Sequence, residues 1–556
     1  MVPVSWAAVF WAVGRLSTPC AAQDANRLSD VPTADAFWSK EWVSSFVIGD
    51  YLYMDGGMLY QVSAGETKRQ QVRNTISIDL SKSWRPRDVQ MMQIPKDAPQ
   101  TARQAYFVDG SSNTVYSWGG LVSENSVPSQ TQLGKFVANG DGGGSWGTET
   151  ESSHEGLAEL RRSHGGAVVS TPDSGFYFGG VSEVTQAAKK DTLVAGYLQF
   201  DFKSQRKTWV NHTTAPYSPS RTHYSASAHY VPSFGPNGLV MVIGGNEYDA
   251  GSDGAKNLVM DTLWFLDPVT QEWYSQRTSG ESPARRRWPC TVGAQSTNNT
   301  YEIFVFGGRD TVLFDDVFVL SLPGFVWKRA DSRPRNGTAR TFMSCVLAGQ
   351  RQMITVGGRN TLQDRPDKDP FPQGLGIFDI TELQWKDEYD SQAAKYDSPE
   401  IIKTWYKAGN LAKVSYDAKV EAFLKSSPNA GDPGSSSDPE GSPVTAGVIA
   451  GIVVGSVSLI ALVGAAAFFL RRRRNRRARG APVPEAGGYP EPGCSLKELS
   501  AASQISELPV KQVNTELQAQ DPRYYAAELD ASTTLQDPRK YFMGVETPSG
   551  NLGSRG

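Results

Sequence analysis

Residues 303–320 read IFVFGGRDTVLFDDVFVL, which is an apolar run, a Gly-Gly doublet, a polar loop and a second apolar run. Similar runs end in a doublet elsewhere, as in YLYMDGG, TVYSWGG, GFYFGG, LVMVIGG and QMITVGG. The six doublets lie at residues 56–57, 119–120, 179–180, 244–245, 307–308 and 357–358. Their spacing of 50 to 65 residues suits a four-stranded propeller blade with loop insertions. The pattern predicts a repeat protein.

Two further features recur around the doublets. A tryptophan follows each one, at Trp84, Trp146, Trp209, Trp273, Trp327 and Trp385. A lead-in with an arginine precedes five of them, and we align these residues as Arg103, Arg162, Arg221, Arg285 and Arg340. We therefore predict that each unit forms four strands: an inner strand, a second strand that ends at the doublet, a third strand, and a fourth strand that carries the tryptophan. One such sheet cannot bury both its faces, so the units should pack around an axis.

This order of arginine, strand, Gly-Gly, loop, strand and tryptophan resembles the kelch repeat. The clearest copy spans residues 283–327, and the six copies together cover roughly residues 37–390. The resemblance implies an all-β fold, a six-bladed kelch-like β-propeller. The first copy lacks the aligned arginine, so the way in which the ring closes stays open. Residues 399–409 are a candidate addition to the ring.

Two apolar segments predict the topology. Residues 1–22 resemble a signal peptide, which would leave residues 23–425 as the propeller ectodomain. Residues 444–470 are the predicted membrane helix; its uncharged stretch 445–470 would span about 37 Å, enough for a bilayer core of about 30 Å. Seven arginines follow within 471–479, which predicts a single-pass type I orientation. We expect the plasma membrane, with the N-terminal domain outside, although the sequence does not identify the membrane. The whole layout resembles the kelch-repeat membrane proteins of filamentous fungi.

The segments that flank the predicted membrane helix have other compositions. Residues 426–443 are rich in Pro, Gly and Ser and predict a flexible stalk. Residues 471–556 form a basic juxtamembrane segment and a tail without apolar periodicity, which predicts disorder. We expect Arg471–Arg479 to attract anionic lipid, although stop-transfer charges alone would explain them. The repeated DPRYY and DPRKY of the tail are candidate sites for a cytoplasmic adaptor, or a chance echo.

Cysteines and sequons agree with an ectodomain in an oxidising compartment. Cys290 and Cys345 each lie five residues after an aligned arginine, so we predict a disulfide between successive blades, with two buried thiols as the alternative. The candidate glycosylation sites are Asn211, Asn298 and Asn336.

The predicted strand directions place the arginine lead-ins and the loops after the doublets on one rim of the ring. The candidate ligand-binding residues there are Arg103, Arg162, Arg221, Arg285, Arg340, Asn246, Arg309, Arg359 and Asn360. Guanidinium groups match carboxylates, which favours an acidic peptide or an anionic glycan as ligand. The competing interpretation is structural, with these arginines paired to carboxylates of the rim.

Other functional classes have less support. The formal net charge is −3, and no global basic field suggests a nucleic-acid partner. The five histidines show no coherent metal spacing, and no nucleophile or phosphate-loop motif is evident. We therefore expect no catalysis, metal or cofactor. The sequence favours a surface sensor or adhesion protein that binds a protein or glycan; the alternatives are a membrane-tethered extracellular enzyme and a scaffold of an internal membrane.

Overall fold

The computed structural model describes residues 28–96, 101–122, 133–149, 154–184, 190–216, 221–249, 256–331 and 337–427. The predicted signal peptide, membrane helix and tail lie outside these residues, as does the stalk except for its first two positions. Among the described residues, no helix combines the length and the apolar character that crossing a membrane requires.

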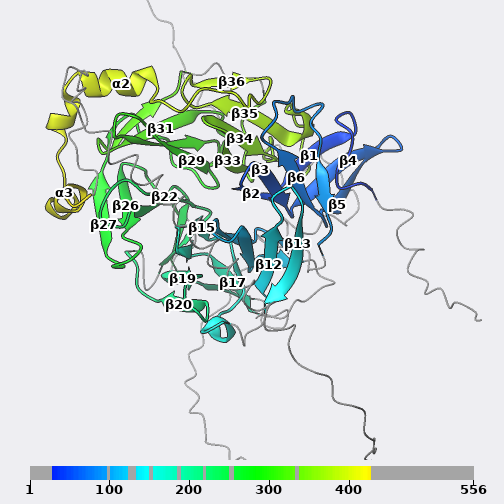
Figure 1. Ribbon diagram of the computed structural model, residues 1–556, viewed down its shortest axis with the longest axis horizontal. Coiled ribbons are helices and arrows are strands. Elements are labelled where there is room, and N and C mark those ends of the chain that lie inside the picture. The colour runs from blue at the N-terminus through cyan, green and yellow to red at the C-terminus, as the bar shows by residue number, and fades with distance from the viewer. Residues whose placement is uncertain are drawn as a thin grey trace, which may run out of the picture. The chain divides into compact units, whose positions relative to one another are not determined.

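The described part of the chain contains six successive sheets of at least four strands, which we call blades 1 to 6 (Figure 1). Their strands, from the inside outward, are β2 (Ser44–Ile48), β3 (Tyr51–Asp55), β6 (Thr75–Asp79) and β7 (Met92–Ile94) in blade 1; β9 (Ala105–Asp109), β10 (Thr114–Trp118), β12 (Leu133–Ala138) and β13 (Gly144–Glu149) in blade 2; β15 (Ala167–Ser170), β16 (Ser174–Phe178), β19 (Tyr197–Asp201) and β20 (Thr208–His212) in blade 3; β22 (Ser227–Val231), β23 (Leu239–Ile243), β26 (Thr262–Leu266) and β27 (Trp273–Arg277) in blade 4; β29 (Cys290–Gln295), β30 (Tyr301–Phe306), β31 (Val317–Leu322) and β32 (Val326–Arg329) in blade 5; and β33 (Ser344–Ala348), β34 (Gln352–Val356), β35 (Leu375–Asp379) and β36 (Gln384–Lys386) in blade 6.

These neighbours pair antiparallel, and β28 (Ser279–Gly280) extends blade 5 by pairing with β32 in parallel. The predicted strand order is confirmed: the second strand of every blade ends at the Gly-Gly doublet. Five of the six aligned tryptophans lie on fourth strands. The exception is Trp84, which was predicted on the fourth strand of blade 1 and instead stacks on Tyr389 with ring centroids 5.2 Å apart.

The blades form a closed ring, a β-propeller. The inner strands of successive blades pack on one another from β9 to β33, β33 of the last blade packs against β2 of the first, and Phe46 of β2 stacks on Tyr106 of β9. In Figure 1 the colour passes around the ring from blue in blade 1 to yellow-green in blade 6 beside it. The buried apolar side chains form clusters between successive blades; Phe46, Tyr53 and Phe136, for example, join blades 1 and 2. Each sheet thus buries both faces against its neighbours.

The doublets hold each blade to the next one. The amide of the second glycine donates to a lead-in carbonyl of the following blade in five junctions: Gly120 to Ser163, Gly180 to His223, Gly245 to Arg286, Gly308 to Arg340 and Gly358 to Lys40, at 2.7–2.9 Å. A Cβ on Gly357 would lie 2.3 Å from the Lys40 carbonyl oxygen, and both glycines of each doublet have positive φ. The recurrence of Gly-Gly is therefore explained by a close approach between blades that excludes side chains.

The ring closes without sharing a sheet between the two ends of the chain. The Gly358–Lys40 bond joins blades 6 and 1, and the backbones of Trp84 and Tyr389 exchange two hydrogen bonds of 2.9 and 3.1 Å. Residues 399–409, the candidate addition to the ring, belong to no blade. They hold α2 (Glu400–Lys407), which with η4 (Asn410–Lys413) and α3 (Ala418–Lys425) forms a strap along blades 4 and 5.

Short sheets extend one end of blades 1 to 4. They are formed by β1 (Phe37–Glu41), β4 (Met58–Ser63) and β5 (Glu66–Gln71); β8 (Thr101–Ala102) and β11 (Leu121–Val122); β14 (Ser163–His164), β17 (Val181–Val184) and β18 (Lys190–Leu193); and β21 (Arg221–Tyr224), β24 (Asn246–Asp249) and β25 (Lys256–Asn257). Two 3-10 helices, η2 (Leu157–Glu159) and η3 (Pro372–Gly374), lie in connections.

Candidate functional site

The lead-ins and the segments after the doublets lie on one rim, as the strand directions predicted. In every blade the first residue after the doublet pairs with the lead-in residue three positions before the inner strand. The pairs are Met58–Glu41, Leu121–Ala102, Val181–His164, Asn246–Tyr224, Arg309–Arg287 and Arg359–Thr341. This pairing defines the true register of the repeats.

The next lead-in residue has a left-handed backbone in all six blades. These residues are Trp42, Arg103, Gly165, Ser225, Trp288 and Phe342, with φ between 51° and 73°. Four of them meet although they come from blades 1, 2, 5 and 6. Because blades 2 and 5 stand opposite each other in a six-membered ring, such contacts place these side chains on the axis. We call Trp42, Arg103, Tyr224, Trp288 and Phe342 the mouth cluster.

The mouth cluster is a stack of aromatic rings around one guanidinium group. The Trp42 and Phe342 rings stack with centroids 3.5 Å apart, and Trp288 meets Phe342 edge-on at 4.7 Å. The Arg103 Cζ lies 3.4 Å from the Trp42 centroid, and Arg103 Nη1 donates to the Tyr224 hydroxyl at 2.9 Å. Cation–π contact and this hydrogen bond hold Arg103 across the axis. Trp42, Arg103 and Trp288 remain partly exposed.

More positive charge surrounds the cluster. The Arg287 Cζ lies 4.7 Å from the Trp288 ring, and the Arg309 Cζ lies 5.7 Å from the same ring. Both side chains are half-buried. Burial, with the charges of Arg103 and Arg162 added, lowers the pKa of the nearby His164 to about 3, so this imidazole stays neutral. The mouth therefore offers guanidinium groups and aromatic faces together.

Asn246 adds a polar group that lacks a partner. It has no exposed surface, and neither its Oδ1 nor its Nδ2 has a hydrogen-bond partner within the described residues. It lies directly opposite Tyr224 in the strand pair, so the two side chains share one face beside the mouth cluster. A buried amide without partners calls for an explanation, and a bound ligand or water at the mouth would supply one.

The predicted alignment of the arginines is wrong. The doublet bonds make Arg286, not Arg285, equivalent to Arg340, and Arg103 is instead equivalent to Phe342. Because three consecutive arginines stand at 285–287, the sequence alone does not show which of them is equivalent to Arg340. Arg285 is exposed.

Arg286 and Arg340, which occupy equivalent positions, have a structural role. Arg340 has no exposed surface; its Nη2 donates to Asp369 at 3.0 Å and its Nη1 to the Gly357 carbonyl at 2.9 Å. Arg286 binds Asp316 and the Gly307 carbonyl in the same way. These forks tie the lead-in to the doublet of the same blade, which is the structural interpretation of the rim arginines.

The other predicted rim residues are scattered. Arg359 is buried and binds Glu41 across the junction of blades 6 and 1, at 2.5 and 2.9 Å. Asn360 donates to the Lys368 carbonyl at 3.1 Å and so orders its own loop. Arg162 is half-buried beside His164, and Arg221 lies on β21 with its side chain outside the described residues.

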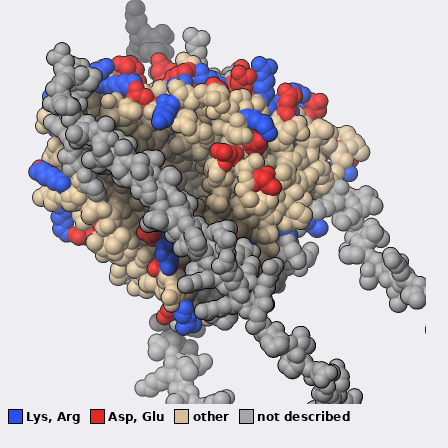
Figure 2. Space-filling model, viewed as in Figure 1, with Lys and Arg blue, Asp and Glu red and all other residues tan. Residues whose placement is uncertain are grey.

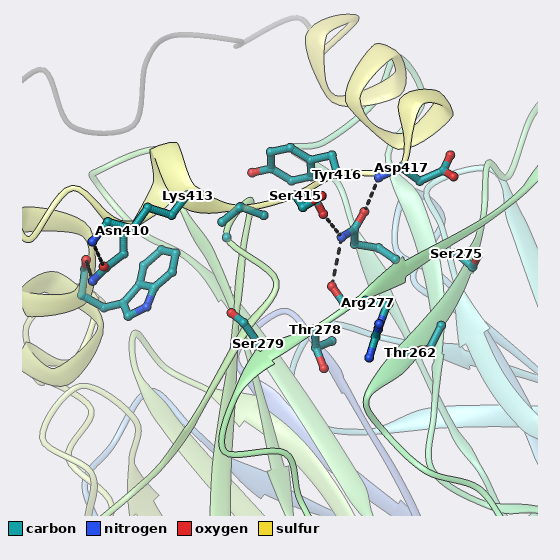
Figure 3. A pocket seen from close by; sticks show the side chains of 14 residues that line it. Thr262, Ser275, Arg277, Thr278, Ser279, Asn410, Lys413, Ser415, Tyr416 and Asp417 are labelled. Atoms are coloured by element: carbon teal, nitrogen blue, oxygen red, sulfur yellow. Dashed lines mark hydrogen bonds between the residues drawn. The ribbon is translucent and has the colours of Figure 1, made fainter.

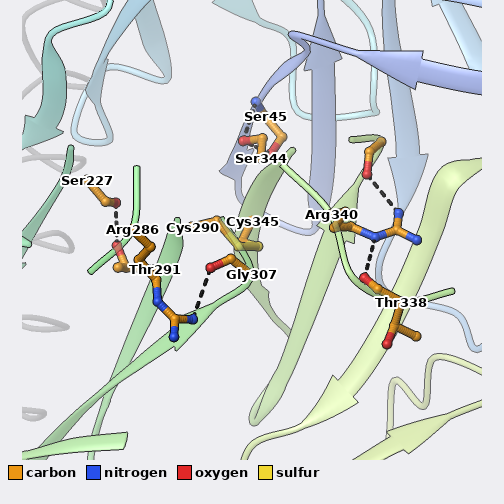
Figure 4. Close-up of a disulfide and its surroundings, with 11 residues drawn as sticks. Ser45, Ser227, Arg286, Cys290, Thr291, Gly307, Thr338, Arg340, Ser344 and Cys345 are labelled. Atoms are coloured by element: carbon orange, nitrogen blue, oxygen red, sulfur yellow. Dashed lines mark hydrogen bonds between the residues drawn. A yellow bond between two sulfur atoms is a disulfide. The ribbon is translucent and has the colours of Figure 1, made fainter. Parts of the chain in front are cut away.

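Cys290 and Cys345 form a disulfide between the inner strands of blades 5 and 6, with Cα atoms 5.6 Å apart (Figure 4). They do not share a register: Cys290 is the first residue of β29 and Cys345 the second of β33. The same first-to-second contact joins Ser227 to Thr291 at 2.8 Å and Ser344 to Ser45 at 2.7 Å. The one-residue stagger between inner strands is what brings the two sulfur atoms together.

The sequons fall on surface segments where they are described. Asn211 and Asn298 are exposed, and Asn336 lies outside the described residues.

In the view of Figure 2, charged side chains of both signs alternate along the edge of the molecule.

Sequence reasoning missed most of the mouth cluster. Trp42, Trp288 and Phe342 occupy one equivalent position, and an alignment on arginines hides it; Tyr224 lies one residue before that position in its own lead-in. An alignment on the doublets and their paired residues would have revealed it.

Comparison with known proteins supports the kelch resemblance. The chain is 23% identical over 527 residues to a kelch repeat-containing protein of Arthroderma benhamiae, covering 79% of this chain and 75% of the relative. No family model matches the chain. The resemblance predicted from the repeats is confirmed by this relative and by the propeller.

Proposed function

We propose that the chain is a membrane-anchored binding protein whose extracytoplasmic propeller recognises an acidic segment of a protein or glycan, as a cell-surface sensor would. The observation that carries the proposal is the mouth cluster with Arg287 and Arg309 around it. Guanidinium groups on aromatic faces bind carboxylates without a large entropic cost, because stacking holds them in place. The amide of Asn246, buried without a hydrogen-bond partner within the described residues and opposite Tyr224, is a further polar group beside the mouth cluster.

The membrane part of the proposal rests on the sequence. Residues 444–470 and the arginines of 471–479 are its support, and the signal peptide, the anionic-lipid contact and the tail adaptor belong to the same proposal. Labelling intact cells with a membrane-impermeant biotin reagent tests the orientation. Labelling of the propeller on intact cells is expected; labelling only after lysis would instead place the protein on an internal membrane.

A defined ligand library tests the binding proposal. The full-length chain would be screened against displayed random peptides and a glycan array, as wild type, as Arg287→Gln, and as Arg329→Gln. Arg329 is the control because it is an exposed arginine on the outer strand of the same blade. We expect the wild type to enrich Asp/Glu-rich peptides or anionic glycans. Enrichment by Arg287→Gln should be about tenfold lower, and enrichment by the wild type should fall at high salt. Equal enrichment by all three chains would contradict a ligand site at the mouth.

A further inference from the structure

A recess lies where the strap crosses the outer side of the propeller, and no residue of the mouth cluster lines it (Figure 3). It encloses about 710 Å³, within the range of small-molecule sites. One wall is the outer strand β27 and the start of β28, with Ser275, Arg277, Thr278 and Ser279. The opposite wall is the strap from Trp405 to Asp417. No element of the proposed mouth site takes part.

The strap is anchored on both sides of this recess, so the recess is a fixed feature of the fold. On one side the Gly324 amide donates to the Tyr406 hydroxyl at 3.1 Å. On the other side the Tyr416 hydroxyl donates to the Pro323 carbonyl at 2.9 Å. Gln276 Nε2 donates to the Ser415 carbonyl at 2.9 Å, and the Asp417 amide donates to Gln276 Oε1 at 3.1 Å. Phe423 of α3 then packs on Tyr274, with centroids 4.7 Å apart.

Trp405 gives the recess a rigid aromatic face. The tip of its ring packs on Gly324, where an added Cβ would lie 2.7 Å from the ring atoms. Tyr406 meets the same ring edge-on at 4.8 Å. The indole is only partly buried, and its N–H donates to no group within the described residues. A fixed, half-exposed indole suits the C–H face of a sugar ring, with the free N–H left for a hydroxyl group.

The remaining lining is hydroxylic and positive. Thr262, Ser275 and Ser279 have no side-chain hydrogen bond within the described residues, so their hydroxyl groups are available. Arg277 is exposed and makes no ion pair there. Lys413 donates only to Asn410 Oδ1, at 3.2 Å. The one carboxylate, of Asp417, already accepts the Lys419 amide as the cap of α3. The two cations of the recess, Arg277 and Lys413, thus form no ion pair within the described residues and are available to an anionic ligand.

We propose that this recess binds an acidic saccharide, with a pyranose ring against Trp405, hydroxyl groups on Ser275 and Ser279, and a carboxylate at Arg277. The ring contact explains a locked aromatic side chain with an unused donor. The guanidinium group explains the preference for an acidic over a neutral sugar, since a carboxylate accepts its fork of donors. This site is independent of the mouth, and neither proposal depends on the other.

Equilibrium dialysis of the full-length chain, in a detergent without a sugar headgroup, tests this proposal. The probes are trigalacturonate, the neutral trisaccharide maltotriose, and inorganic sulfate. We expect trigalacturonate to bind, and Trp405→Leu and Arg277→Gln each to weaken it about tenfold. Arg69→Gln is the control, because Arg69 is an exposed arginine on β5. Arg277→Gln removes an exposed side chain, so it separates loss of binding from loss of folding.

Each other result would overturn a stated part of the proposal. Absence of trigalacturonate binding to the wild type, or equal binding by all variants, overturns the site. Equal affinity for maltotriose overturns the acidic ligand. Full competition by sulfate, with no effect of Trp405→Leu, overturns the saccharide and leaves a simple anion site. Repeating the series in the Arg287→Gln background separates this site from the mouth: the losses caused by Trp405→Leu and Arg277→Gln should persist there, and their disappearance would overturn the recess as the site.

Discussion

Gly308 shows how one residue joins two blades. Its amide donates to the Arg340 carbonyl of blade 6, its φ is 91°, and an added Cβ would lie 2.9 Å from the Arg287 carbonyl oxygen. We expect Gly308→Ala to lower the free energy of unfolding by about 2 kcal/mol or more, from backbone strain and overlap together. Urea unfolding measures it. Gly147→Ala is the control, since Gly147 is exposed on β13 with open space around its Cβ position, and should be nearly neutral.

The buried amine of Lys40, at the ring junction, destabilises the folded state while it is protonated. Burial lowers its pKa to about 8, against the ordinary 10.5, so the folded state is penalised while the amine is protonated. The penalty is complete below pH 8 and is relieved as the pH rises toward 10.5. We expect Lys40→Met to stabilise the fold at pH 7 by about 3 kcal/mol, with the gain shrinking by pH 9.5. Denaturant unfolding at several pH values checks this, and a gain that does not change with pH would contradict it.

At the scale of elements, the stagger between inner strands determines which side chains meet. Cys290 and Cys345 close a separation of 55 residues, for which the chain-entropy estimate is about 4 kcal/mol. The double variant Cys290→Ser/Cys345→Ser should lose about that much in the free energy of unfolding. The equivalent Ser45→Ala/Ser344→Ala pair loses two hydrogen bonds to Ser344 Oγ, from the Ser45 hydroxyl and from the Ser45 amide, so its cost should be about 2 kcal/mol. Equal losses for the two pairs would contradict a covalent contribution at blades 5 and 6.

Element order could be read from the sequence, but register could not. The Gly-Gly doublets and apolar runs predicted the second strands, because their glycines and burial are local requirements of each blade. The arginines misled the alignment, since Arg286 and Arg340 bind carboxylates while Arg103 reaches the axis. Trp84 was misplaced because its role is to close the ring against Tyr389, which lies 305 residues later in the chain.

At the scale of the whole molecule, the mouth cluster exists only because the ring closes. Its residues come from blades at both ends of the chain, so no single repeat contains the site. Sequence reasoning found the rim and two of its cations, Arg103 and Arg309, but not the aromatic stack that holds them. The recess under the strap was also not predicted, because residues 399–409 were considered only as a candidate addition to the ring and no separate helix was expected there.

Closure of the ring is the central claim, and a designed disulfide tests it most directly. Ser45 of blade 1 and Ser344 of blade 6 stand as Cys290 and Cys345 do, with hydroxyl oxygens 2.7 Å apart. Ser45→Cys/Ser344→Cys should oxidise to a disulfide, found by mass spectrometry as a peptide pair linked in a non-reduced digest. Ser227→Cys/Thr291→Cys, at the junction of blades 4 and 5, is the positive control. Linkage of both pairs is the result the closed ring predicts; linkage of 227–291 with free thiols at 45 and 344 would show that blades 1 and 6 do not meet.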